Sequence, residues 1–139
     1  MIIRSKAPLR IGLAGGGTDV SPYSELFGGA ILNATIDLYA YASLEPLDNG
    51  NIEFLIDGTD KRFVTASKKE LQVIPEFELF IGVYNRVVKQ FGLEALSFRL
   101  TSYIEAPQGS GLGTSSTLVV SMLGAFVEWL QLPLGKYDI

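Results

Sequence analysis

A glycine-rich segment late in the chain constrains the fold more than any other feature of the sequence. Residues 107–117 read Pro-Gln-Gly-Ser-Gly-Leu-Gly-Thr-Ser-Ser-Thr and lie between a strand-like run at 96–104 and a long apolar pattern at 115–130. Glycines let backbone N–H groups approach an anion, and the positive end of the following helix dipole faces the same point. The segment therefore predicts a strand–loop–helix unit that holds phosphate.

The spacing of this loop excludes three common phosphate motifs. A Walker A loop requires a Lys before its Ser or Thr, and the sequence has no Lys between Lys89 and Lys136. The dinucleotide fingerprint Gly-x-Gly-x-x-Gly also fails, because the third glycine, Gly113, comes one residue early. The glycine loop of protein kinases fails for the same reason.

Hydroxyl side chains gather where the loop enters the predicted helix. Thr114, Ser115 and Ser116 occupy its first turn, where a hydroxyl can cap the helix or ligate a metal bound to phosphates. This cluster favours phosphate binding over the alternative, a flexible connection in which glycine merely permits a tight turn. Since the loop holds no Lys, charge compensation falls to backbone N–H groups, the helix dipole and Mg²⁺.

Hydrophobic periodicity along the rest of the chain predicts a two-layer α+β domain. Strands are expected at 2–5, 9–13, 30–45 (as one strand or two), 52–56, 62–65 and 96–104, with 52–56 and 62–65 forming a hairpin. Helices are expected at 22–26, 79–91 and 115–130, and another is expected to start at Ser67, with Glu70 completing a capping box. Residues 134–139 read as the start of a further element. A right-handed crossover is the default for parallel strands.

Composition narrows the chemistry that the chain can perform. The 139 residues contain no Cys and no His, which removes disulfides, thiolate or imidazole zinc sites and His-based triads. A metal must then be a hard ion held by oxygens, which favours Mg²⁺. The net charge of −4 without a basic run argues against nucleic-acid binding, and no apolar stretch has membrane-spanning length. We therefore expect a cytoplasmic protein with neither nucleic acid nor a membrane as partner.

A second unusual motif lies near the N-terminus. Residues 8–19 read Pro-Leu-Arg-Ile-Gly-Leu-Ala-Gly-Gly-Gly-Thr-Asp, which places Arg10 inside an apolar strand and Thr18 and Asp19 after three glycines. Taken alone, Arg10 fits a strand residue that faces solvent, and Asp19 fits a cap for the short helix expected next.

Together the two motifs resemble those of the GHMP small-molecule kinases. The pattern Pro-x-Arg-Ile-x-Leu-x-Gly-Gly-x-Thr-Asp is followed, far along the chain, by Pro-x-x-x-Gly-Leu-Gly-Thr-Ser-Ser. Within that family, residues 7–19 look most like the branch of heptose 7-phosphate kinases, with fucokinase domains close by. Gly17 stands where galactokinases carry a His, which argues against galactose as the substrate.

The resemblance implies a fold and a set of roles. The fold is an α+β domain similar to ribosomal protein S5 domain 2, with a left-handed βαβ crossover in place of the right-handed default. The ATP phosphates would lie against Pro107, Gly109, Ser110, Gly111, Leu112, Gly113, Thr114, Ser115 and Ser116. Ser115 matches the position that helps ligate Mg²⁺, and Arg10 matches a catalytic basic residue near the transferred phosphoryl group. The sugar hydroxyls would be held by Asp19, with Thr18 and Gly17 beside it. Aromatic residues of the 79–91 helix and the preceding strands would contribute to an adenine pocket.

The resemblance spans the whole chain but only the N-terminal part of the family's length. Family members are usually much longer, and their catalytic Asp and a further glycine-rich motif lie beyond the point where this chain ends, Ile139. We therefore expect residues 1–139 to be an incomplete ATP-binding domain that lacks the catalytic Asp and the C-terminal domain. The implied full-length activity is transfer of the γ-phosphoryl group of ATP to a hydroxyl of a heptose 7-phosphate-like sugar.

Two interpretations of the 139-residue chain stay open at this point. In the first, it is a fragment of such a kinase, inactive alone, whose partners are the sugar phosphate, its own missing C-terminal half or a second copy. In the second, it is a stand-alone nucleotide-binding or regulatory module of the same fold.

Overall fold

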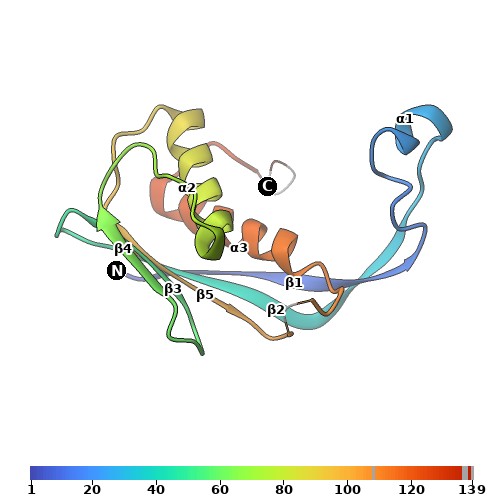
Figure 1. The fold of residues 1–139 in the computed structure, drawn as a ribbon, viewed down its shortest axis with the longest axis horizontal. Helices are drawn as coiled ribbons and strands as arrows, with labels where there is room; N and C mark the ends of the chain where they lie inside the picture. The colour runs from blue at the N-terminus through green and yellow to red at the C-terminus, as the bar shows by residue number, and fades with distance from the viewer. Residues whose placement is uncertain (108, 136–137, 139) are drawn as a thin grey trace.

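The computed structural model describes residues 1–107, 109–135 and 138. The strands are β1 (Ile3–Ala14), β2 (Leu32–Pro46), β3 (Asn51–Ile56), β4 (Arg62–Ala66) and β5 (Phe98–Ile104). The helices are α1 (Tyr23–Phe27), the 3-10 turn η1 (Pro75–Phe77), α2 (Glu78–Phe91) and α3 (Thr114–Leu130). In these ranges the strands form one sheet in the order β1-β2-β5-β3-β4, and α2 and α3 lie on one face of it (Figure 1). The predicted two-layer α+β fold is therefore confirmed.

The sheet is mixed. β1 pairs antiparallel with β2, and β2 pairs antiparallel with β5. The predicted hairpin of β3 and β4 is confirmed by the antiparallel pairing of Phe54 with Phe63. β3 and β5 run parallel and are connected through β4 and α2. The hand of that crossover stays a prediction. No helix in the described part of the chain is long and apolar enough to cross a membrane.

Two sequence predictions about single elements are wrong. Two short strands were expected on either side of Pro8, but β1 is continuous, with a register shift between Pro8 and Arg10. β1 lies at the edge of the sheet, where a residue without an N–H is tolerated. The helix expected from Ser67 does not form, because the Ser67 hydroxyl donates to the carbonyl of Leu96 and cannot cap a following helix. The element expected at 134–139 lies largely outside the described residues.

The hydrophobic core lies between the sheet and the two long helices. Its fully buried side chains include Leu9, Leu44, Ile52, Phe54, Ile81, Tyr84, Phe98, Leu100, Met122 and Phe126. Small residues bring α3 close to the sheet edge: a Cβ on Gly124 would lie 2.5 Å from the Ser5 hydroxyl of β1. This packing holds the N-terminus of α3 near the middle of β1, and so fixes where the glycine-rich loop lies.

The distal halves of β1 and β2 extend beyond the body of the domain as a two-stranded arm (Figure 1). α1 lies at the end of this arm and buries none of its residues. Leu26 and Phe27 of α1 are 70% and 73% exposed. Helix α1, at the end of the arm, therefore contributes no side chain to the hydrophobic core of this chain.

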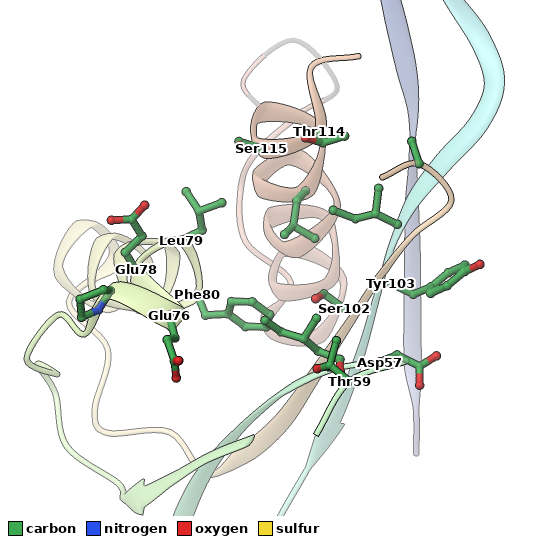
Figure 2. Close-up of a pocket in the computed structure, with 15 residues that line it drawn as sticks. Asp57, Thr59, Glu76, Glu78, Leu79, Phe80, Ser102, Tyr103, Thr114 and Ser115 are labelled. Carbon is green, nitrogen blue, oxygen red and sulfur yellow. The ribbon is translucent and has the colours of Figure 1, made fainter. Parts of the chain in front are cut away.

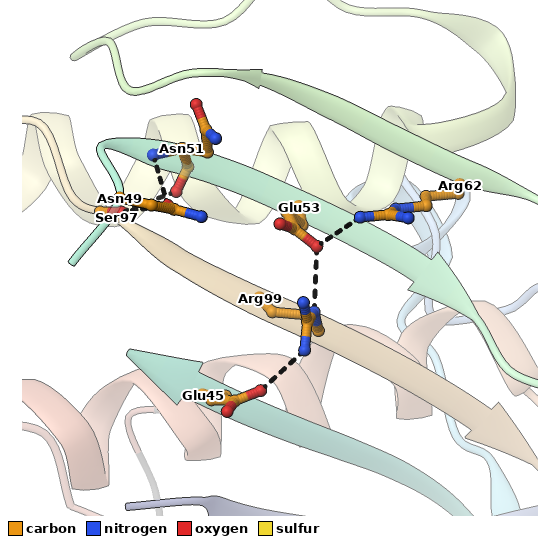
Figure 3. Close-up of polar contacts among 7 residues, drawn as sticks. All are labelled: Glu45, Asn49, Asn51, Glu53, Arg62, Ser97 and Arg99. Carbon is orange, nitrogen blue, oxygen red and sulfur yellow. Dashed lines mark hydrogen bonds and ion pairs between the residues drawn. The ribbon is translucent and has the colours of Figure 1, made fainter. Parts of the chain in front are cut away.

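A polar network crosses the sheet face opposite the helices (Figure 3). The Glu53 carboxylate of β3 accepts hydrogen bonds from Arg99 and Arg62, each at 3.0 Å, and Arg99 also contacts Glu45 at 3.0 Å. The Glu53 side chain is only 6% exposed. Chiefly because Arg99 hydrogen-bonds the carboxylate, the pKa of Glu53 lies below its ordinary value of 4.5.

Glu53 should make the stability of the fold depend on pH. A carboxyl group with a lowered folded-state pKa stabilises the fold above the unfolded pKa, and this contribution is lost as pH falls through the folded pKa. We expect Glu53→Gln to lower the free energy of unfolding at pH 7 by about 1 kcal/mol, a small value because solvent screens the partly exposed arginines. Urea unfolding between pH 7 and pH 3 should show a steeper loss below pH 4.5 for the parent chain than for Glu53→Gln. If the unfolding free energies of the two proteins fell in parallel with pH, the proposed contribution of the ionised Glu53 carboxylate would be contradicted.

Candidate functional site

Helix α3 begins with an N-terminus that no side chain caps. Its N-cap residue is Gly113, and no side-chain hydrogen bond is made there. Of the two roles considered for the hydroxyls of the first turn, capping is not observed, because the N-cap position itself is occupied by glycine. The first intrahelical hydrogen bond of α3 is donated by the Thr117 N–H to the Gly113 carbonyl, at 3.0 Å. The N–H groups of Thr114, Ser115 and Ser116 come before it and have no acceptor within the helix. An anion at this point would meet free donors and the positive end of the helix dipole.

The loop before α3 requires glycine at three positions. Gly109, Gly111 and Gly113 have φ values of 81°, 73° and 70°, a conformation that other residues rarely adopt. Between them, the N–H of Ser110 donates to the Pro107 carbonyl at 3.2 Å, which closes a turn. The predicted glycine loop is therefore present. Gln108, which falls inside it, lies outside the described residues.

The N-terminal motif meets this loop through Arg10. The Arg10 N–H donates to the Leu112 carbonyl at 3.2 Å. Its side chain lies over Gly113, because a Cβ added there would be 3.2 Å from Nε and 3.3 Å from Cγ of Arg10. The guanidinium is exposed and contacts the Asn33 side-chain oxygen of β2 at 3.5 Å. The structure thus brings together two motifs that are far apart in the sequence, with a cation beside the uncapped start of α3.

A cavity of about 380 Å³ lies next to the start of α3 (Figure 2). Its lining comes from the ends of β3 and β5, the start of α2 and the start of α3. Apolar walls are provided by Ile56, Pro75, Leu79, Phe80, Ile104, Ala106 and Leu118, and polar groups by Asp57, Thr59, Glu76, Glu78, Ser102, Tyr103, Thr114 and Ser115. The lining that the structure describes contains no Lys or Arg. The positive electrostatic potential beside the cavity therefore comes from the N-terminus of α3 and from Arg10, which lies next to it.

Sequence reasoning identified only part of this lining. Thr114 and Ser115 were named in advance, and the contribution of the helix at 79–91 was expected only in general terms. Asp57 and Ser102 were missed because they belong to different segments that meet only through strand pairing. The Asp57 N–H donates to the Ser102 carbonyl at 2.8 Å. Ser102 did carry a signal, since it is a polar residue among the inward-facing apolar residues of β5.

The remaining site candidates lie on the arm. The Thr18 hydroxyl lies 2.8 Å from the Gly15 carbonyl and 3.1 Å from the Ala30 carbonyl, and it accepts the Ala30 N–H at 3.1 Å. A Cβ on Gly15 would lie 1.9 Å from the Ala30 carbonyl oxygen, so the two sides of the arm approach closely here. The structure therefore gives Thr18 a bracing position within the arm.

Asp19 and Gly17 are exposed next to this turn. The capping alternative for Asp19 is wrong, because the N-cap residue of α1 is Pro22 and no side chain caps that helix. Among the described residues, no hydrogen bond or ion pair joins 17–19 to the glycine loop. Within the described residues, no hydrogen bond or ion pair involves the Asp19 carboxylate.

The site can be tested for its fit to a metal ion. Within the described residues, no three carboxylates, imidazoles or thiolates gather around a common point. The oxygen donors of the cavity lining at the start of α3 are the hydroxyls of Thr114 and Ser115. These are hard ligands of the kind that Mg²⁺ accepts, and Mg²⁺ usually takes only one or two protein ligands when it is held by nucleotide phosphates.

Replacing Gly113 should disturb Arg10 as well as the loop. Gly113→Ala forces a side chain into a left-handed conformation and against the Arg10 side chain. Gly111→Ala imposes similar backbone strain, but a Cβ there meets nothing within 4 Å. We expect urea unfolding to show a loss of about 1 kcal/mol for Gly111→Ala and a larger loss for Gly113→Ala. Equal losses would contradict the packing of Arg10 on Gly113.

Removing the Thr18 hydroxyl should loosen the arm without unfolding the domain. In Thr18→Val, the Ala30 N–H loses its acceptor, while the buried core is untouched. Hydrogen exchange should become faster at residues 15–31 and stay unchanged in α2 and β5. Thr59→Val, which removes a turn hydroxyl that donates to Ile56, is the matched control and should leave the arm unaffected. Faster exchange across the whole chain would show that the arm is not an independent unit.

Comparisons with known proteins give matches over most of this chain. Residues 78–139 match the model of the GHMP kinases N terminal domain. Over 137 residues the chain is 47% identical to the D-glycero-alpha-D-manno-heptose 7-phosphate kinase of Campylobacter jejuni, with 99% of this chain and 40% of that protein covered. The crystal structure of a D-glycero-D-manno-heptose 1-phosphate kinase from Bacteroides thetaiotaomicron is 54% identical and superposes with a TM-score of 0.93, covering 99% of this chain and 45% of that one.

More distant structures share the fold alone. The mevalonate kinase of Methanococcus jannaschii superposes with a TM-score of 0.79 at 16% identity, over 97% of this chain and 42% of that one. The chain spans about 40% of the length of the curated heptose kinase that it matches. The chain is therefore similar to the N-terminal part of the heptose phosphate kinases, and its residues 78–139 match the GHMP kinases N terminal domain.

Proposed function

We propose that residues 1–139 are the N-terminal, ATP-binding domain of a longer sugar kinase. That enzyme transfers the γ-phosphoryl group of ATP to a hydroxyl of a heptose phosphate. The single observation that carries the proposal is the meeting of Arg10 with the glycine loop at the uncapped start of α3. Phosphoryl transfer depends chiefly on positioning and on cancelling negative charge, and both kinds of group are gathered at this point.

The nucleotide would lie with its phosphates at the glycine loop and its base in the cavity. The phosphates need donors and positive charge, which the free N–H groups of α3 and the Arg10 guanidinium supply. The base needs apolar walls, and Phe80 and Leu118 are among the residues that provide them. The hydroxyl of Ser115 is placed to complete the coordination of Mg²⁺ carried by the phosphates, as the family resemblance implies.

The sugar would be held by the outer part of the arm, beyond the ends of β1 and β2. Asp19 is exposed there, and a carboxylate accepts hydrogen bonds from two neighbouring hydroxyls, which selects the oxygen that faces the γ-phosphate. Thr18 and Gly17 would shape this subsite through the turn that they form. The relatives' names place the existing phosphate of the heptose at position 7 in one case and position 1 in the other. We favour the 7-phosphate, as the sequence motif suggested.

The catalytic Asp and a C-terminal GHMP domain would follow in the longer protein, which would act in the cytoplasm. On this proposal the chain of 139 residues binds nucleotide but does not turn over. The second candidate is a nucleotide-binding module without catalysis. It is supported by the presence of both the glycine loop and the cavity in this chain.

Arg10 gives the most direct test of the proposed site. Titration calorimetry should show saturable binding of MgATP to the chain, and Arg10→Ala should weaken it about tenfold, the effect of losing one charge-assisted hydrogen bond. Arg86→Ala removes the same charge from the exposed face of α2 and should leave affinity unchanged. With heptose 7-phosphate added, the chain alone should release no ADP above background.

Different results separate the alternatives. Equal affinity of Arg10→Ala and Arg86→Ala would contradict the role of Arg10 at the phosphates. Turnover by the chain alone would contradict the expected absence of a catalytic base. Turnover by the product of a longer reading frame, but not by the 139 residues, would favour the kinase over the binding module.

A further inference from the structure

One buried hydroxyl stands out among the buried polar side chains that the structure describes. These are Glu53, Ser102, Thr117 and Ser121. Glu53 is bonded by two arginines, Thr117 donates to the Gly113 carbonyl, and Ser121 donates to the Leu118 carbonyl. Ser102 is 2% exposed, and no described residue forms a hydrogen bond with its hydroxyl. A hydroxyl that no protein group pairs is left to bind solvent or a ligand.

The Ser102 hydroxyl faces the cavity beside α3. In the described part of the chain, no side-chain nitrogen or oxygen is both sealed from solvent and without a hydrogen bond. The unpartnered Ser102 oxygen must therefore border accessible space, and the residue lines the cavity (Figure 2). Ser102 lies on the helix-facing side of β5, where its neighbours across the sheet are Ala42 and Ile56. The Ser102 hydroxyl therefore lies between apolar neighbours on the sheet, beside a cavity whose lining also includes the polar residues Asp57 and Thr59.

The surroundings of Ser102 fit a flat heterocycle. Phe80, Leu79 and Leu118 form apolar walls that a planar ring can contact on its faces. A serine hydroxyl both donates and accepts, so it can pair with an amino group or with a ring nitrogen or carbonyl. Phosphates at the start of α3 would leave the opposite end of a nucleotide directed into this cavity.

We propose that the Ser102 hydroxyl binds the polar edge of the nucleobase and is a determinant of nucleotide affinity. This inference rests on the proposed function, since it takes the cavity to be the nucleoside end of the ATP site. Because the hydroxyl can pair with either a donor or an acceptor, Ser102 raises the affinity for a ligand that has a nucleobase. It contributes little to the choice between adenine and guanine.

The test compares a ligand that has a base with one that lacks it. Calorimetry of the 139-residue chain with MgATP and with magnesium tripolyphosphate measures the two affinities separately. Ser102→Ala should weaken MgATP binding about fivefold, the effect of one neutral hydrogen bond, and leave tripolyphosphate binding unchanged. Ser102→Thr retains the hydroxyl and should retain most of the MgATP affinity.

A second variant separates binding from folding. Ser121→Ala removes a buried hydroxyl that bonds only within α3, so it should lower the melting temperature without changing either affinity. Melting curves of all variants show that the chain is folded under the titration conditions.

Each contrary result has a distinct meaning. If the parent chain binds MgATP and Ser102→Ala binds it equally well, the inference about Ser102 is overturned while the proposed ATP site stands. If Ser102→Ala loses affinity for both ligands to the same extent, the hydroxyl acts on the phosphate site and the base contact is overturned. If the parent chain binds neither ligand, the proposed function is overturned and the inference with it.

Discussion

The close packing of α3 against the edge strand β1 is the contact on which the site depends. Gly124 lets the helix approach Ser5, and at the helix start Gly113 lies against the Arg10 side chain. Next to Gly113, the Arg10 N–H donates to the Leu112 carbonyl and joins the loop to the strand. A Cβ at position 124 would meet the Ser5 hydroxyl at 2.5 Å, and one at position 113 would meet the Arg10 side chain at 3.2 Å, so either change would require these side chains to shift. Helix packing and the electrostatics of the site are thus set by the same small residues.

Two further parts of the molecule follow from this arrangement. The cavity lies where α2 and α3 diverge above the ends of β3 and β5, so apolar walls continue directly from the phosphate-binding loop. The arm carries Asp19 outward on the continuation of the same edge strand that bears Arg10. One strand therefore connects the proposed phosphate and sugar subsites, and the Thr18 hydroxyl joins the two sides of the arm beyond the end of that strand.

Local sequence patterns were enough to predict most helices and strands and the glycine loop. Hydrophobic periodicity and the positions of glycines are signals that lie within short stretches of sequence. The α2 and α3 helices and the glycine loop follow from such signals, and the meeting of Arg10 with the loop was expected from the family resemblance. Contacts between distant segments decided the rest. Ser67 bonds Leu96 and so starts no helix. Glycine at position 113 takes the N-cap, and Ser102 joins the cavity only through strand order. These facts depend on tertiary neighbours that a single sequence does not specify.

The central claim is that two distant sequence motifs form one nucleotide-phosphate site at the start of α3. Titrating MgATP into the isotopically labelled 139-residue chain, while following backbone amide shifts by NMR, tests it most directly. The account predicts saturable shifts concentrated at Gly109–Ser116 and at Arg10, with a second group at the cavity residues of α2 and β5. Shifts confined to other surfaces, or changes in the loop without any at Arg10, would contradict it.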